Sequence, residues 1–277
     1  MTRTSLLALA VSAALLAGCE TVETTKEGTV CVDRQQHMLV SEQDVEASAQ
    51  KQYAAMMADA QKKSALDRNG AQVQRVKAIV GRLVPQTAVF RPDAQKWAWE
   101  VHVLSSSEVN AWCMPGGKMA VYTALIEKLQ PTEDELAAVM GHEISHALRE
   151  HAREQISRQM GTQMAVGIAG AILGVGELGQ NLGNMGADVT INLPYSRTNE
   201  TEADRMGVEL AARAGYNPHS AISLWEKMDK LNSGGQPPKW FSTHPANEDR
   251  IKDLKVYAEK VMPLYQAAVK GGASAGK

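Results

Sequence analysis

The feature that most restricts the fold of this chain is a predicted helix, from Thr132 to about Gln159, with two histidines four positions apart. Thr132 and Glu135 form a capping-box pattern directly after a proline, and this pattern predicts where the helix begins. Positions i and i+4 lie about 40° apart around a helix axis and about 6 Å apart along it, so His142 and His146 can direct imidazole nitrogens at one ion. The helix therefore predicts a metal site flanked by apolar residues.

The neighbours of the two histidines indicate the kind of metal site. Glu143 projects beside two neutral imidazoles, which suit zinc, and three protein ligands plus water would leave one position open for chemistry. His151 follows His146 by five residues and so points about 140° away, where we expect a structural hydrogen bond or contact with solvent. The alternative is a purely structural zinc site, which is disfavoured because such sites usually close the fourth position with Cys or His.

A second predicted helix, from about Arg197 to Ala214, offers the third ligand. Glu200 and Asp204 share one face at i and i+4, whereas Glu202 points roughly opposite, where a solvated helix face is expected. We assign Glu200 to the metal. We assign Asp204 to a hydrogen bond with the outer ring N–H of a ligating histidine, which would fix the tautomer of that histidine.

These motifs resemble those of the gluzincin metallopeptidases, a family that includes HtpX, the CAAX prenyl proteases, BepA and LoiP. The resemblance covers about residues 70 to 260 and is carried by residues 142–151 and 200–207. It implies an α+β, mostly helical, zincin-like fold with a small β-sheet beside the HExxH helix. It also implies a zinc metalloendopeptidase with one Zn2+ per chain, in which Glu143 is the general base for a zinc-bound water.

His244, in the string Ser-Thr-His-Pro, has three possible roles. A developing oxyanion needs a donor besides the metal, and His244 is the first catalytic candidate, ahead of Tyr195, Arg197 and Arg250. In related proteins a histidine on the corresponding loop can approach the metal and shield it, which gives a latent enzyme. The third interpretation is a loop histidine that only satisfies a turn.

The first 18 residues predict a secretory signal peptide. An apolar run from Leu6 to Ala17 follows Arg3 and is too short to span a bilayer. The end of this run resembles a bacterial lipobox, which predicts a mature chain beginning at an acylated Cys19; an ordinary signal peptide with an incidental cysteine is the alternative. By resemblance to bacterial sorting rules, Glu20 favours the outer membrane of a Gram-negative bacterium, where the lipid-anchored chain would face the periplasm. The resemblance is therefore closest to LoiP-like periplasmic lipoproteins.

Two cysteines remain after lipidation, Cys31 and Cys113. An exported protein meets conditions in which disulfides persist, so the pair could form a bridge. The alternative is two separate thiols, one of them buried in a strand. Spacing alone leaves both open, because it does not show whether the two backbones approach each other.

The remaining pattern predicts one domain with additions at both ends. We interpret residues 19–40 as a tether, 41–270 as the metallopeptidase domain with flanking helices, and 271–277 as a disordered tail. Apolar periodicity predicts strands at residues 97–104 and 118–122, and helices at 42–66, 73–83, 218–231 and 246–269.

Two of these segments leave alternatives open. The strand after Gly117 offers either an edge for an extended peptide, by β-augmentation, or a paired core strand. Residues 164–175 either dip into a membrane surface or, as we favour, pack as a helix near the site.

Composition and resemblance together suggest the partners. The formal net charge of -2 shows no strongly basic surface, so we expect no nucleic-acid partner. The resemblance implies cleavage of misfolded or unassembled cell-envelope proteins in protein quality control, with the outer-membrane assembly machinery as a further partner. The alternative is a chaperone or outer-membrane assembly factor that keeps the fold and acts mainly by binding; an intact Glu143 favours catalysis.

The anchor can be tested directly. We expect mass spectrometry of the mature protein to show a chain that starts at Cys19 and carries acyl groups on that residue. An unmodified Cys19 thiol would exclude the lipoprotein interpretation.

Overall fold

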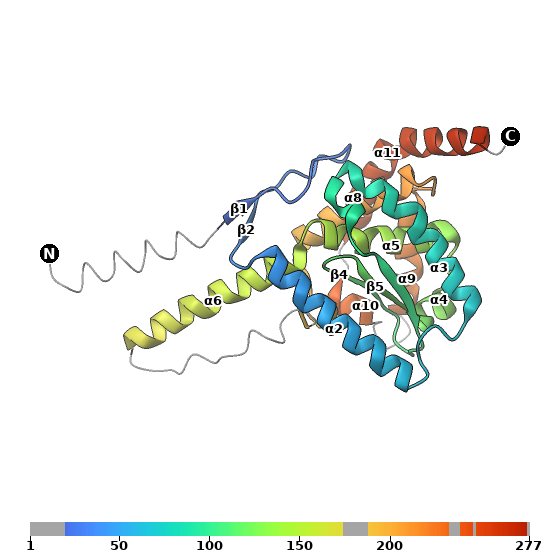
Figure 1. The fold of residues 1–277 in the computed structure, drawn as a ribbon. Helices are drawn as coiled ribbons and strands as arrows, with labels where there is room; N and C mark the ends of the chain where they lie inside the picture. The colour runs from blue at the N-terminus through green and yellow to red at the C-terminus, as the bar shows by residue number, and fades with distance from the viewer. Residues whose placement is uncertain (1–19, 174–187, 233–238, 246–247, 276–277) are drawn as a thin grey trace.

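The computed structural model describes residues 20–173, 188–232, 239–245 and 248–275. At its centre is a three-stranded sheet in the order β3-β5-β4, in which β5 is parallel to β3 and antiparallel to β4 (Figure 1). A separate pair of strands, β1 and β2, lies near the start of the described chain. The expected α+β, mostly helical architecture with a small sheet beside the motif helix is confirmed. The strands are β1 (Glu20–Val22), β2 (Gln36–Met38), β3 (Glu100–Leu104), β4 (Ala111–Met114) and β5 (Lys118–Tyr122).

Each predicted helix is present with bounds close to those expected, apart from one break described below and a longer α11, whereas α4 and α10 were not predicted. The α-helices are α2 (Glu42–Lys62), α3 (Gly70–Leu83), α4 (Thr123–Leu129), α5 (Glu133–Leu148), α6 (His151–Leu173), α8 (Arg197–Arg213), α9 (Ser220–Asn232), α10 (Lys239–Thr243) and α11 (Glu248–Ala275). Two 3₁₀ helices, η1 (Val84–Val89) and η2 (Pro92–Lys96), and one π-helix, η3 (Asp188–Asn192), complete the description.

Both faces of the sheet are buried. On one face, Trp112 and Ala120 pack with Tyr53 of α2, and on the other, Cys113 and Val121 join the main core that contains α3 and α5. Because β5 pairs on both sides, the strand after Gly117 is a paired core strand, and the prediction of an open edge there is wrong. β4 is the edge strand beside α5. The sequence did not predict this strand, because its residues are all apolar and do not alternate with polar ones.

The motif helix ends earlier than predicted. A continuous helix to Gln159 is wrong, because Glu150 has φ +51° and separates α5 from α6. A left-handed backbone is uncommon for a residue other than glycine. Here the carboxylate of Glu150 is held by Arg91 at 2.6 Å and by Arg153 at 2.7 Å. No Gly or Pro in the sequence marks this break, and it redirects the residues that follow it.

The helices α5 and α8 approach each other through two glycines. A Cβ at Gly141 would lie 2.8 Å from the carbonyl oxygen of Gly207, and a Cβ at Gly207 would lie 2.8 Å from the backbone nitrogen of His142. Real Cβ atoms essentially never come that close, so neither position admits a side chain without a backbone shift. The two helices that carry the predicted site therefore lie in backbone contact.

The N-terminal segment (residues 20–40) is folded rather than free. β1 pairs with β2, and Val30, Val32 and Met38 are buried against the rest of the protein. The interpretation of this stretch as a tether is therefore wrong for the residues described. Its apolar residues are too irregularly spaced to show a period of a helix or a strand, which is why the sequence did not reveal its packing.

Several further expectations can be compared with the structure. Cys31 is exposed and Cys113 is buried in β4, and both are free thiols, so of the two alternatives left open by the spacing, that of separate thiols holds. The helix α11 continues to Ala275, so a disordered tail from residue 271 is also wrong. The signal peptide, Cys19 and the side chains of residues 164–175 lie outside the described parts of the chain.

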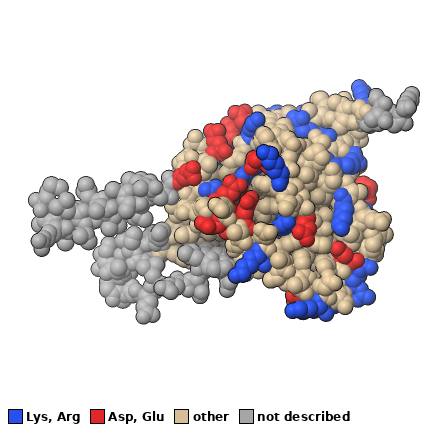
Figure 2. Space-filling model, in the orientation of Figure 1, with Lys and Arg blue, Asp and Glu red and all other residues tan. Residues whose placement is uncertain are grey.

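Surface and helix composition add two observations. Among the described residues, no helix combines the length and apolar character needed to cross a membrane. Basic and acidic side chains are intermixed over the face shown in Figure 2, in keeping with the small net charge.

The glycine contact leads to a prediction. Replacing Gly207 with Ala should lower the free energy of unfolding by about 1–3 kcal/mol, because the added methyl group overpacks the contact with α5. The matched control is Gly81→Ala in α3, where a Cβ would meet nothing within 4 Å; that change should stabilise the protein by about 0.5–1 kcal/mol. Urea unfolding followed by circular dichroism measures both, and equal stability of the two variants would contradict the proposed contact.

Candidate metal centre

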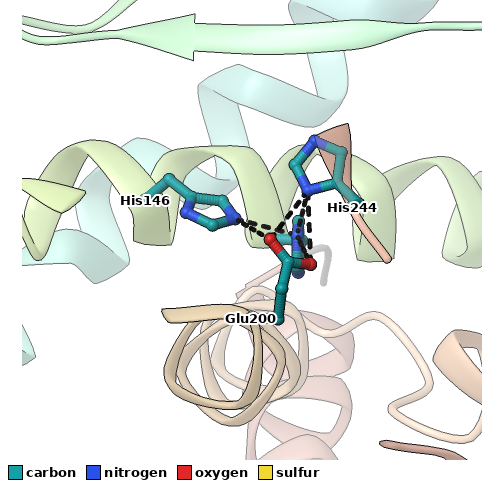
Figure 3. Close-up of side chains that lie close together, drawn as sticks. His146, Glu200 and His244 are labelled. Atoms are coloured by element: carbon teal, nitrogen blue, oxygen red, sulfur yellow. Dashed lines mark hydrogen bonds and ion pairs between the residues drawn. The ribbon is translucent and has the colours of Figure 1, made fainter. Parts of the chain in front are cut away.

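Four side chains from three separate segments converge in the core. His142 and His146 come from α5, Glu200 from α8, and His244 from the residue that follows α10. Figure 3 shows His146, Glu200 and His244 pointing toward one another. One nitrogen or oxygen of each lies within 4.8 Å of the others, and all four residues are buried. The structure thus brings together the three predicted ligands, and adds His244 to them.

The ligand atoms lie at close range. The Nε2 atoms of His142 and His146 are 3.0 Å apart, and the carboxylate of Glu200 lies 3.4 Å from Nε2 of His146 and 3.6 Å from Nε2 of His142. This geometry follows from the sequence spacing, since i and i+4 place the two rings on one face of α5. The Gly141–Gly207 contact then brings Glu200 within reach.

Asp204 holds His142 as predicted. Its Oδ1 lies 2.9 Å from Nδ1 of His142, so that ring donates from Nδ1 and keeps the lone pair of Nε2 for the centre. Arg250 donates two hydrogen bonds of 2.7 Å to Asp204 and also pairs with Glu200 at 2.7 Å. Burial alone would raise the pKa of Asp204, but Arg250 and His142 outweigh it and keep that pKa below its usual value.

His146 is held in a different way. Its Nδ1 lies 2.9 Å from Nδ1 of His151, and Nε2 of His151 lies 3.0 Å from Oε2 of Glu202. His151 thus makes a structural hydrogen bond, but the prediction that it points away from His146 is wrong, because the break at Glu150 turns its ring toward that ligand. The expected solvated face at Glu202 is wrong, because that residue is 6% exposed and its carboxylate is paired within the core.

Glu143 has the environment of a proton acceptor. It is 2% exposed, and its Oε1 has no hydrogen-bond partner among the described residues, with Nε2 of His244 3.5 Å away. Burial raises the pKa of Glu143, although His244, His142 and a backbone hydrogen bond from Cys113 oppose the shift. A buried carboxylate oxygen without a partner is rare and points to a group that the polypeptide itself does not supply.

The donor set fits a divalent metal ion. With Nδ1 of His142 and of His146 each engaged elsewhere, both Nε2 lone pairs face each other at 3.0 Å beside the carboxylate of Glu200. Such a group of acceptors is stable when a cation lies among them. Two imidazoles and one carboxylate are a set that transition-metal dications accept.

His244 is fixed from several sides. Its Nδ1 lies 3.1 Å from Glu200 and 3.2 Å from Nε2 of His142, and its ring stacks on Trp240 with centroids 4.2 Å apart. Burial alone would lower the pKa of His244, but Glu200 and Glu143 outweigh it and raise that pKa. The interpretation of His244 as a residue that only satisfies a turn is therefore wrong.

Of the other three candidate donors to an oxyanion, two lie at the metal centre and one does not. Tyr195 stacks on His146 with centroids 4.0 Å apart, and Arg250 pairs with Glu200. Arg197 instead lines an open pocket near Arg34, away from the ligand atoms. Sequence reasoning did not find Trp240 or Arg34; a single tryptophan before a loop, or an arginine in an aperiodic segment, carries no local signal.

A helix bearing HExxH, a small mixed sheet against it and a carboxylate from a second helix together define a zincin-like metallopeptidase domain. The chain belongs to peptidase family M48, whose model matches residues 70–258.

Several characterised proteins are similar to this chain. It is 36% identical over 159 residues to the mitochondrial metalloendopeptidase OMA1 of Schizosaccharomyces pombe, covering 57% of this chain and 46% of that protein. It is 27% identical over 255 residues to the metalloprotease YcaL of Escherichia coli, covering 90% of this chain and 95% of that protein. It is 29% identical over 187 residues to the β-barrel assembly-enhancing protease of Escherichia coli, covering 64% of this chain and 38% of that protein. The chain spans less than half the length of its OMA1 relatives.

Proposed function

We propose that this chain is a zinc-dependent endopeptidase with one Zn2+ held by His142, His146 and Glu200. The observation that carries the proposal is the buried convergence of these ligand atoms beside a carboxylate oxygen of Glu143 that has no hydrogen-bond partner among the described residues. A structural zinc site would not require an unpaired carboxylate oxygen, such as that of Glu143, beside the ligands.

The side chains divide the work of peptide hydrolysis. Zinc, when bound, lowers the pKa of a water molecule and polarises the scissile carbonyl. Glu143 accepts the proton from that water at its free oxygen and transfers it to the departing amine. Asp204 holds the ring of His142 in the required tautomer, and Arg250 keeps both Asp204 and Glu200 ionised.

The sheet edge at β4 supports a peptide substrate. Among the described residues, β4 pairs with a strand on one side only, that of β5, and it packs on α5; the backbone of Cys113 in β4 hydrogen-bonds to Glu143. A peptide in extended form that paired with β4 would lie alongside the catalytic base. Pairing through main-chain groups is independent of side-chain sequence, which suits unfolded polypeptides as substrates.

His244 supports a closed form of the enzyme. Its Nδ1 lies among the ligand atoms, where it would compete with a water molecule or a peptide carbonyl for a bound metal. Backbone hydrogen bonds hold the segment that contains α10 at both ends, from Trp240 to Val109 and from Tyr195 to Thr243. We infer that His244 shields the metal in this form and moves aside when a peptide binds.

Location and physiological role rest on the N-terminal pattern and the relatives. The lipobox-like sequence at Cys19 supports an outer-membrane, LoiP-like lipoprotein that faces the periplasm. Similarity to a protease named for enhancing β-barrel assembly supports contact with the outer-membrane assembly machinery. Unfolded or misfolded envelope proteins are the proposed substrates, in keeping with main-chain recognition at β4.

The Glu143→Gln variant tests the proposed chemistry. It should bind zinc as the native chain does and should lose at least about 10²-fold in the rate of cleavage of an unfolded substrate such as β-casein, because the proton acceptor is gone. Glu127→Gln, in an exposed part of α4, is the matched control and should keep full activity. Full activity of Glu143→Gln would refute the mechanism, and β-casein binding without cleavage by the native chain would favour a chaperone.

The His244→Ala variant tests the closed form. Removing the ring should raise the rate of β-casein cleavage about tenfold, as expected if shielding stabilises the closed form by about 1.4 kcal/mol. A fall of about 10²–10³ in kcat would instead identify His244 as the oxyanion donor and contradict shielding.

A further inference from the structure

The two histidine ligands are supported by unlike partners. The ring of His142 donates from Nδ1 directly to a carboxylate, that of Asp204. The ring of His146 contacts the imidazole of His151, and that imidazole in turn contacts the carboxylate of Glu202. This second arrangement lies outside the ligand set and was not expected from the sequence, since His151 and Glu202 were placed on other faces of their helices.

The position of every proton along this path follows from the ligand role of His146. A metal takes the lone pair of Nε2, so Nδ1 of His146 carries hydrogen and must donate. Nδ1 of His151, 2.9 Å away, is then an acceptor, and the hydrogen of that ring is on Nε2. That N–H in turn donates to Oε2 of Glu202 at 3.0 Å, and a carboxylate can only accept it. One tautomer of each ring satisfies all three groups.

The far end of the path is fixed by two arginines. Arg34 of the N-terminal segment donates from Nε and Nη2 to the two oxygens of Glu202, at 2.7 and 3.1 Å, and Arg149 donates from Nε at 3.3 Å. Arg149 also donates to the carbonyl oxygen of Arg34 at 2.8 Å, which ties the two arginines together. With its oxygens held in this way, Glu202 cannot rotate away from His151.

The break between α5 and α6 is what brings His151 next to His146. On a continuous helix, His151 would point about 140° away from His146. The left-handed Glu150 instead returns the ring of His151 to within a hydrogen bond of His146, and His151 is completely buried there. The uncommon backbone conformation of Glu150 thus places a second imidazole where it can support the metal ligand His146.

We propose that His151 and Glu202 are positioning residues that set the tautomer and orientation of His146, and that Arg34 and the N-terminal segment complete this support. The proposal rests on the metal centre proposed above. The chain from Arg34 through Glu202 and His151 to His146 makes metal affinity depend on a segment that contributes no ligand.

Metal affinity of the full chain is the decisive measurement. In competition with a chromophoric chelator, His151→Phe should bind Zn2+ about 10–100-fold more weakly than the native chain, because Nδ1 of His146 loses its acceptor. His151→Gln should recover part of the loss, since an amide oxygen can accept from that N–H. The visible spectrum of the Co2+-loaded chain should shift in His151→Phe and return toward the native spectrum in His151→Gln.

A matched pair of variants separates positioning from general stability. The side chains of Glu154 and Glu202 are both buried and both pair with Arg34, but Glu202 is the one that contacts His151. Glu202→Gln should weaken Zn2+ binding severalfold and Glu154→Gln should leave it within about twofold, at similar losses in thermal stability. This pair decides the matter if His151→Phe does not fold.

Two results would overturn the proposal. One is native Zn2+ affinity and an unchanged Co2+ spectrum in a folded His151→Phe chain; the other is an equal loss of affinity in Glu154→Gln and Glu202→Gln. In either case a native chain that binds Zn2+ and cleaves β-casein leaves the proposed enzyme standing. Failure of the native chain to bind any metal would refute the proposed metal centre.

Discussion

The backbone contact between α5 and α8 is the constraint on which the rest of the structure depends. A side chain between the two backbones at this point would hold α5 and α8 farther apart, toward the upper end of the usual separation of about 8–10 Å between helix axes. Gly141 and Gly207 carry no such side chain, so the two backbones touch. His142 and His146 of α5 then lie at close range to Glu200 and Asp204 of α8. The centre is thus a consequence of how closely two helices can pack.

Burying so many charges is costly, and the structure offsets much of the cost by pairing carboxylates with arginines. Isolated ions lose several kcal/mol on leaving water, whereas hydrogen-bonded pairs recover much of that loss. Arg250 neutralises the acidic side of the centre, next to Asp204 and Glu200, and Arg34 with Arg149 does the same for Glu202. The remaining negative charge at Glu200 and Glu143 lies where a metal dication is expected, so folding and metal binding stabilise each other.

The parts of the site that sequence predicted are those governed by helical spacing. His142, His146, Glu200 and Asp204 each occupy positions i and i+4 on a helix, and the structure places them as expected. Prediction was wrong where tertiary contacts override local pattern. The break at Glu150 has no Gly or Pro signal, β4 is apolar on both faces, and the N-terminal segment has no period, so none could be inferred from neighbouring residues.

The long separations within the centre affect the order in which it can form. Arg34 and Glu202 lie 168 positions apart in the chain, and His142 and His244 lie 102 positions apart. Contacts between such distant residues close late, because a long loop must first be ordered. A chain still being synthesised therefore carries Arg34 and the HExxH helix before the third ligand, Glu200, has been made. The hydrolytic centre has no means to act on neighbouring polypeptides until these later residues have been added and have folded against α5.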